Sequence, residues 1–346
     1  MALYNKVNKE ELKEQLQEST EERTTLSFYR YHQIEDVPHF RNELYRLLEP
    51  LGVFGRIYVA KEGINGQISL PSQNITAFRT ALETYPFLKD MRLNVAIDDD
   101  GKSFYLLKIK VRDKIVADGI DNPVDLSKGG EHINAERFNE LVKKENTVVI
   151  DMRNHYESEV GHFDQAICPD VETFRHSLPI VEDILEEHRG KDVVMYCTGG
   201  IRCEKATAYF RQKGFENLYQ LDGGIIEYAR QVRERNLPNH FIGKNFVFDE
   251  RLGERISEDV IAQCHQCGSP CDAHRNCAND ACHLLFIQCQ KCEQQFSGCC
   301  SSKCKEFISL PNEEQVELRK KIQFNGSKFG KGRYKANKTG DTLDIS

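Results

Sequence analysis

Long apolar segments are missing from this chain of 346 residues. No run of 18 consecutive apolar residues occurs, so no transmembrane helix is expected. The start, MALYNKVNKEELKEQ, is polar and has no apolar core of a secretory signal peptide. Internal repeats, flavin and haem motifs and an oxygen-activating iron triad are missing as well. We therefore expect a cytoplasmic protein, in which 13 cysteines serve as ligands, nucleophiles or core residues rather than as disulfides.

Acidic residues are missing from residues 319–338, although the whole chain has a formal net charge of −7. The overall sign argues weakly against a dedicated nucleic-acid binder, but this segment has eight basic residues interleaved with aromatic ones. Such a pattern fits phosphate contacts with base stacking, although similar segments are often simply solvated and disordered. Within a basic C-terminal tail (311–346), we predict RNA contacts from Lys328, Lys331, Arg333 and Lys335.

The N-terminal part predicts a ferredoxin-like domain over residues 24–112, after a helical or frayed extension at 1–23. Hydrophobic periodicity and turn residues give strand, helix, strand, strand, helix, strand, which is the βαββαβ order of that fold. The expected elements are strands 25–31, 55–60, 66–71 and 92–98 and helices 38–51 and 72–85. This fold supports many functions, RNA binding among them, so it does not decide the function.

Residues 113–133 have little periodicity and are expected to be a linker. In residues 134–232, short Val- and Ile-rich strands alternate with helices, which predicts a parallel α/β sheet covered on both faces. The expected elements are helices 134–144, 179–188 and 203–213 and strands 147–151, 192–197 and 217–224. Residues 246–262 are expected to be a second connector, and they form the start of a small cysteine-rich metal-binding module, 246–310.

The candidate nucleophile is Cys197, which follows the strand DVVMY where open α/β sheets bind ligands. A glycine-containing loop that enters a helix can point its backbone amides inward, and these amides favour an anion at the centre of the loop. Together with the charge of Arg202, they lower the pKa of a thiol there. The other loop residues are Thr198, Gly199, Gly200 and Ile201. Six residues from Cys to Arg make a smaller pocket than the seven-residue phosphate loop of cysteine phosphatases, and suit a sulfane sulfur. The alternative is a buried structural cysteine, which the Gly-Gly pair and the arginine argue against.

Several segments match the rhodanese pattern in order and spacing, namely DMRN at 151–154, GHF at 161–163, CTGGIR at 197–202 and LDGGI at 221–225. The resemblance implies a persulfide on Cys197, and it suggests that Asp151 and Arg153 support the loop. A structural ion pair at a strand end explains those two residues equally well. Cys203, in the next helical turn, is interpreted as a packing residue rather than as a thiol that resolves a persulfide or sulfenate.

The whole chain beyond about residue 20 resembles the bacterial tRNA uridine hydroxylase family (TrhO). The resemblance rests on EGINGQIS at 62–69, CTGGIRCEKA at 197–206, and CHQCG and LLFIQC within 264–289. It implies oxygen-dependent conversion of the wobble uridine of certain tRNAs to 5-hydroxyuridine, with an essential rhodanese cysteine. Molecular oxygen is then a co-substrate, the anticodon arm of tRNA is the partner, and a sulfur donor is a further candidate partner.

Ten of the 13 cysteines lie between residues 264 and 304. Pairs with short spacing bring two thiolates to one tetrahedral ion, and two such pairs complete its four ligands. The first set is Cys264, Cys267, Cys289 and Cys292, and the interleaved second set is Cys277, Cys282, Cys300 and Cys304. We predict two structural zinc ions and favour them over an iron–sulfur cluster, with nearby cysteine and histidine residues as substitute ligands.

The leading hypothesis is therefore a tRNA uridine 5-hydroxylase in which Cys197 or its persulfide adds to C6 of uracil. A rhodanese-type sulfurtransferase is the alternative enzyme, and its product would be thiolated rather than hydroxylated. A regulatory binding protein is the alternative of another class. An intact loop of cysteine, two glycines and arginine argues against it, because binding alone does not require those residues.

Overall fold

The computed structural model describes residues 8–324, 326 and 333–334. Its N-terminal part contains a five-stranded sheet in the order β4-β1-β3-β2-β5. The strands are β1 (Arg23–Tyr31), β2 (Phe54–Ala60), β3 (Gly63–Pro71), β4 (Asn94–Val95) and β5 (Leu107–Val111). Neighbouring strands β4, β1, β3 and β2 are antiparallel, as in the predicted ferredoxin-like fold, whereas β5 is parallel to β2.

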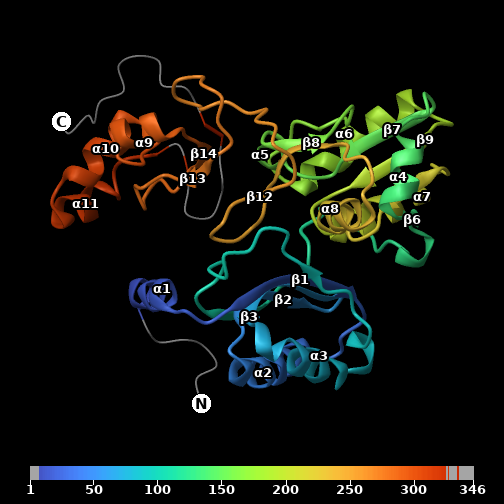
Figure 1. Cartoon of the computed structure of the whole chain (residues 1–346), viewed down its shortest axis with the longest axis horizontal. Helices are drawn as coiled ribbons and strands as arrows, with labels where there is room; N and C mark the ends of the chain where they lie inside the picture. Colours follow the sequence, from blue (N-terminus) through green and yellow to red (C-terminus); the bar gives the residue numbers. More distant parts are fainter. Residues whose placement is uncertain (1–7, 325, 327–332, 335–346) are drawn as a thin grey trace.

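The two faces of this sheet have different partners, because side chains alternate along each strand. Leu26 and Phe28 of β1 belong to a core formed with α2 (Val37–Leu48) and α3 (Ile75–Glu83). The two helices lie below the sheet in Figure 1, whereas the domain with strands β6 to β10 lies above it. The intervening β1 side chains therefore point away from the helices, toward the domain that follows. Helix α1 (Lys9–Glu18) precedes the sheet, and Lys13 on it pairs with Glu250.

The second part is built on a parallel sheet in the order β6-β10-β9-β7. The strands are β6 (Glu131–Ile133), β7 (Thr147–Asp151), β9 (Asp192–Tyr196) and β10 (Leu218–Leu221). One face packs on α6 (Phe174–Glu187) and α7 (Ile201–Gln212), and the other on α4 (Ala135–Leu141) and α8 (Gly224–Arg235). This is the predicted parallel α/β arrangement, covered on both faces.

A three-stranded antiparallel sheet of β8 (Gly161–Phe163), β11 (Phe241–Asn245) and β12 (Glu254–Arg255) extends this part, and α5 (His155–Ser158) precedes β8.

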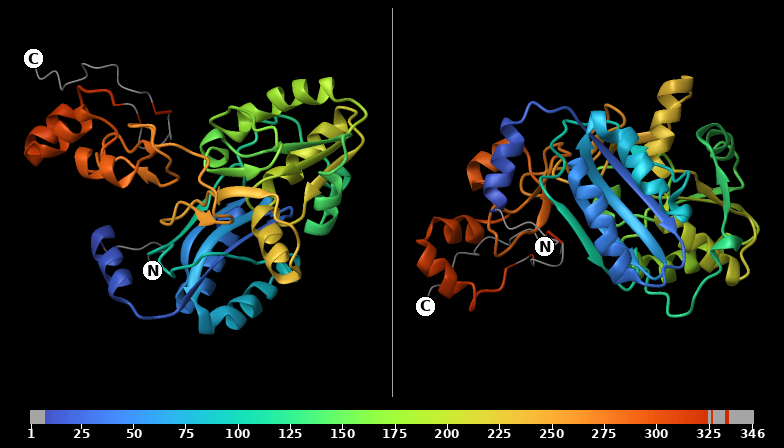
Figure 2. Two further views of the ribbon diagram at one scale, coloured as in Figure 1. Left: turned by 45° about the horizontal axis from the view of Figure 1, so that its top comes forward. Right: turned by 90° about the horizontal axis from the view of Figure 1, so that it is seen from below.

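The cysteine-rich part lies to one side of both domains in Figure 2. It contains β13 (His274–Asn276), β14 (Leu285–Ile287), α9 (Gln290–Phe296), α10 (Ser302–Ser309) and α11 (Asn312–Leu318). None of the described helices is both long and apolar enough to cross a membrane.

The structure differs from the sequence-based expectation at several segments. The strand expected at 92–98 is only Asn94–Val95, and the helix expected at 179–188 begins earlier, at Phe174. Residues 107–111 form the additional strand β5, and residues 131–133, expected at the end of a linker, form β6 of the parallel sheet. Part of the expected 246–262 connector forms β12, which pairs with β11. These strands are short. Strands β5 and β6 pair with strands that are distant in the sequence, whereas β12 pairs with the strand just before it.

Candidate active site and metal centres

Cys197 follows the end of β9 directly and is 1% exposed. The Gly200 amide donates to its Sγ at 3.2 Å. Gly200 has a φ of +102° and caps α7, so the loop turns there in a conformation that glycine adopts without strain. Burial alone would raise the pKa of the Cys197 thiol, but the Cys203 thiol, the charge of Arg202 and the loop amides lower it to about 6. At neutral pH the thiolate therefore predominates.

Arg202 lies in the first turn of α7 and is largely buried. Its Nη2 lies 2.9 Å from a carboxylate oxygen of the fully buried Glu157. Glu157 also accepts from the Asn154 amide in the capping box of α5, which holds the carboxylate in place. Glu157 therefore orients the guanidinium that stabilises the thiolate. Glu157 lies between the DMRN and GHF segments that match the rhodanese pattern, but the sequence does not indicate its role.

Asp151 and Arg153 form a fully buried ion pair with Nη2 and Oδ2 at 2.7 Å. Asp151 also accepts from the Tyr196 hydroxyl at 2.8 Å, and Arg153 donates to the carbonyl of Gly161 at 2.6 Å. The pair therefore lies behind the end of β9 and fixes the residue that precedes Cys197. Among the described interactions it makes no contact with the Cys197 thiol.

The start of α8 closes the other side of the loop. The Ile225 amide donates to the Cys197 carbonyl at 3.0 Å. Gly224 has a φ of +66°, and a Cβ at this position would lie 2.5 Å from the Cys197 carbonyl oxygen. Gly224 is thus required by the close approach of two backbone segments, and the preceding Gly223 also has a positive φ, of +69°.

The N-terminal sheet covers the loop and is tied to α7 by polar contacts. Tyr31 donates its hydroxyl to the carbonyl of Ile201 at 3.2 Å. Lys205 on α7 is buried and forms ion pairs with Glu62, from the β2–β3 turn, at 2.5 Å and with the fully buried Asp118. These contacts join the EGING segment to the CEKA segment, which lie far apart in the sequence.

A cavity of about 240 Å³ lies between the N-terminal sheet and the loop. The domain with the parallel sheet contributes Cys197, Thr198, Gly199, Ile201, Arg202 and Ile226. The sheet contributes polar side chains of β1 to β4, and the segment 247–254 contributes the remaining wall. Cys197 therefore lines a cavity that the two domains form together.

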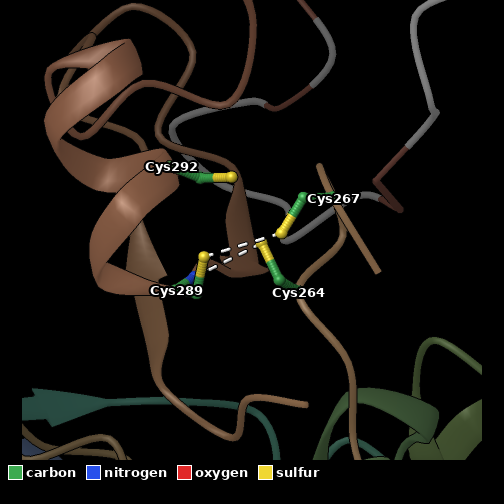
Figure 3. A group of neighbouring side chains, drawn as sticks. All are labelled: Cys264, Cys267, Cys289 and Cys292. Carbon is green, nitrogen blue, oxygen red and sulfur yellow. Dashed lines mark hydrogen bonds between the residues drawn. The ribbon is translucent and has the colours of Figure 1, made fainter. Parts of the chain in front are cut away.

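Cys264, Cys267, Cys289 and Cys292 form the first cysteine group (Figure 3). Their Sγ atoms lie within 4.8 Å of one another, with Cys267 and Cys289 at 3.6 Å. Tetrahedral zinc with Zn–S bonds of ~2.3 Å requires sulfur–sulfur separations of about 3.8 Å. The Cys289 amide also donates to the Cys264 Sγ at 3.3 Å, an arrangement that supports thiolate ligands.

Cys277, Cys282, Cys300 and Cys304 form the second group and are all buried. Cys300 lies 3.7 Å from both Cys282 and Cys304, measured between Sγ atoms. These distances also fit a tetrahedral ion and are far longer than a disulfide bond of about 2.05 Å. Both groups therefore have the donor set and the spacing for a four-coordinate metal ion.

Comparisons with known proteins cover most of the chain. Family models match as a UPF0176 acylphosphatase like domain at residues 23–115, a rhodanese-like domain at 134–231 and a rhodanase C-terminal domain at 242–305. The tRNA uridine(34) hydroxylase of Photorhabdus laumondii is 54% identical over 96% of this chain and 95% of its own length. That of Cronobacter sakazakii is 55% identical over 97% of both chains. This chain belongs to the tRNA uridine(34) hydroxylase family.

The tRNA uridine(34) hydroxylase of Yersinia pestis, 56% identical over 92% of this chain, agrees with that assignment. Two solved structures that resemble this chain match only about a third of it or less. A rhodanese-like domain from Anabaena is 18% identical and covers 32% of this chain and 78% of its own, with a TM-score of 0.26. A rhodanese-like domain protein from Staphylococcus aureus covers 28% of this chain and 90% of its own, at 19% identity and a TM-score of 0.24. Both scores are too low to support an argument.

For this hydroxylase-family chain, the structure brings together the six predicted loop residues, and it brings together each predicted set of four cysteines. Most of the residues predicted to contact RNA are not described by the structure. Lys328, Lys331 and Lys335 lie outside the described residues. The remaining one, Arg333, pairs with Asp170 at 2.5 Å and with Glu172 at 3.5 Å.

Proposed function

We propose that this chain hydroxylates C5 of the uridine at position 34 of tRNA, using molecular oxygen and the thiolate of Cys197. Two lines of support are independent of each other. Curated relatives that match more than 90% of the chain are named tRNA uridine(34) hydroxylases. The observation that carries the chemistry is the Cys197 thiol, whose pKa is lowered to about 6 in a cavity between two domains.

The proposed reaction begins with addition of the thiolate to C6 of uracil. The electron pair of the C5–C6 double bond then moves toward O4, which makes C5 nucleophilic toward an oxidant. After C5 receives oxygen, loss of the C5 proton expels the thiolate and restores the double bond. Insertion of one oxygen atom of O2 also consumes two electrons and two protons to form water, so the reaction requires a two-electron reductant such as a dithiol.

A second candidate function is sulfur transfer, and the loop geometry supports it. The Gly200 amide and the Arg202 charge, which stabilise a thiolate, equally stabilise a persulfide on Cys197. A sulfur donor would then be a second partner. The two functions differ in product, because sulfur transfer to tRNA adds sulfur without consuming oxygen.

We further propose that the two cysteine groups hold structural zinc and that the basic tail contacts the anticodon arm. Four thiolates complete the tetrahedral coordination of zinc and leave no position open for catalysis. The proposed substrate implies that the protein acts in the cytoplasm.

Nucleoside mass spectrometry tests the proposed function. Digested tRNA from cells that lack the protein is compared after complementation with wild type or with Cys197→Ser. Wild type should add the mass of one oxygen to uridine, and ¹⁸O₂ should label it. Cys197→Ser should leave uridine unmodified while binding tRNA normally, because serine is barely ionised at neutral pH. A thiolated nucleoside would favour sulfur transfer, and hydroxylation by the variant would remove Cys197 from the mechanism.

A further inference from the structure

Polar side chains of the N-terminal sheet face the loop of residues 197–202, which we call the reactive loop because the proposed reaction takes place there. Ser27 on β1 lies directly opposite Asn94 on β4, so both side chains project from the same face of the sheet. Both residues line the cavity that contains Cys197. A Cβ built on Gly199 would lie 3.5 Å from Asn94 Nδ2 and 4.0 Å from Ser27 Oγ, so the pair lies against the loop itself.

Several buried polar atoms in this cavity have no hydrogen-bond partner among the described residues. They are Ser27 Oγ, Asn94 Oδ1 and Thr198 Oγ1, together with Arg202 Nη1. Asn94 is only 5% exposed. Folded proteins pair nearly all of their buried polar groups, so a cluster of unpaired ones around a cavity indicates a ligand that completes them.

The chemistry of these atoms fits the edge of a uracil base. That edge presents an acceptor, a donor and an acceptor, at O2, N3–H and O4. Asn94 Oδ1 is an acceptor, whereas the Ser27 and Thr198 hydroxyls can both donate. The cavity volume of about 240 Å³ lies below the roughly 300–1,000 Å³ of pockets for drug-sized ligands and suits one pyrimidine ring.

We propose that this cavity receives the target uracil after it rotates out of the anticodon stack, with N3–H donating to Asn94 Oδ1 and the carbonyls accepting from Ser27 and Thr198. This proposal rests on the proposed function, and it identifies the residues that select the base. Enzymes that modify a base commonly extrude it into such a pocket and bind its Watson–Crick edge. Tyr29, Tyr58 and Phe248 also line the cavity and supply aromatic surface for stacking.

The test uses full-length protein and tRNA transcripts with 2-aminopurine at position 35, next to the target. Wild type and Cys197→Ser should both raise the fluorescence, because extrusion of uridine 34 unstacks its neighbour. Asn94→Ala and Ser27→Ala should each reduce the rise and increase KM about tenfold, as expected for loss of one hydrogen bond to a buried group. Asn42→Ala, which removes an amide on α2 on the opposite face of the sheet, is the matched control and should behave as wild type.

A modified substrate isolates the proposed contact. A transcript with 3-methyluridine at position 34 lacks the N3–H donor, so wild type should discriminate strongly against it. Asn94→Ala should lose most of that discrimination, whereas Ser27→Ala should retain it. The unfolding midpoint of Asn94→Ala should not fall, because the Asn94 oxygen is unpaired in the free protein.

Failure of the base pocket and failure of the proposed function are distinguishable. If Asn94→Ala keeps the wild-type KM, fluorescence rise and discrimination against 3-methyluridine, the base pocket is wrong even though hydroxylation continues. If wild type raises the fluorescence but leaves uridine unmodified, the proposed function is wrong and the base pocket stands. A wild-type protein that binds tRNA without any fluorescence change would overturn the pocket.

Discussion

The hydroxyl of Tyr29 donates to the carboxylate of Glu204 at 2.9 Å and thereby joins β1 of the N-terminal sheet to α7 of the rhodanese part. Glu204 is two residues beyond Arg202, so this hydrogen bond lies within one helical turn of the reactive loop. A Cβ on Gly200 would lie 2.9 Å from the same hydroxyl. The N-terminal sheet therefore approaches the loop as closely as a glycine allows, and the reactive cavity depends on how the two domains are held together.

The Cys203 thiol is expected to control the ionisation of Cys197. It is fully buried, and its hydrogen bond is the largest of the effects that lower the pKa of Cys197 to about 6. Cys203→Ala should therefore raise that pKa toward the ordinary thiol value of about 8.5. The thiolate, and the activity that needs it, should be lost as the pH falls below about 6 in wild type and at a higher pH in the variant.

The measurement is the pH dependence of iodoacetamide labelling, followed by mass spectrometry of the peptide that contains Cys197. Cys168→Ala is the matched control, because Cys168 donates to the Ala166 carbonyl and does not act on the Cys197 thiol. An unchanged labelling midpoint in Cys203→Ala would show that Arg202 and the loop amides suffice.

The ion pairs of Lys205 should contribute to the stability of the domain interface. Lys205→Ala leaves the fully buried Asp118 with Lys114 as its remaining cation. The Glu62 carboxylate loses this ion pair and keeps the hydrogen bond from the Ile115 amide. Removing one partner of a buried pair costs roughly 3–5 kcal/mol, so the urea midpoint should fall clearly. Lys213→Ala, on the exposed end of the same helix, removes a solvent-exposed pair with Glu182 and should cost less than about 1 kcal/mol. Equal midpoints for the two variants would contradict a structural role for the buried pairs.

The reactive loop was predictable because its residues are contiguous, so sequence spacing alone specifies its geometry. The two cysteine groups followed from pair spacing in the same way. The opposite wall of the cavity was not predictable, because Ser27 and Asn94 reach the loop only through the docking of one domain on another. Strand β5 did have a signal, since Leu107, Ile109 and Val111 alternate with charged residues, whereas the three residues of β6 are too few to show a period.

Metal analysis of purified protein should find about two zinc ions per chain. Cys267→Ser and Cys282→Ser should each remove one ion, because they belong to different groups. A chelator should extract zinc faster from the first group, since Cys267 is exposed whereas all four cysteines of the second group are buried. Cys271→Ser, outside both groups, is the control and should retain both ions. Iron with visible absorbance, or folded protein without metal, would contradict the assignment.

The lysines of the C-terminal tail should contribute to tRNA affinity by neutralising phosphates. Replacing Lys328, Lys331 and Lys335 with glutamine is a sharper test than deletion, because Phe324 and Tyr334 pack on Phe307 and Phe286 of the cysteine-rich part. For every phosphate of single-stranded RNA that the variant no longer neutralises, the log–log salt dependence of binding should flatten by roughly 0.7. Arg333→Gln alone should have a smaller effect, because its guanidinium already pairs with Asp170.

The matched control replaces Lys143, Lys144 and Lys191 with glutamine. These lysines precede β7 and β9, at the edge of the parallel sheet opposite Cys197, so the control changes the net charge equally but away from the cavity. Filter-binding titrations at several salt concentrations separate the two outcomes. If the tail lysines contact the anticodon arm, the slope flattens only in the tail variant. If they act through net charge alone, both variants bind more weakly to the same extent, and the tail is not part of the tRNA-binding surface.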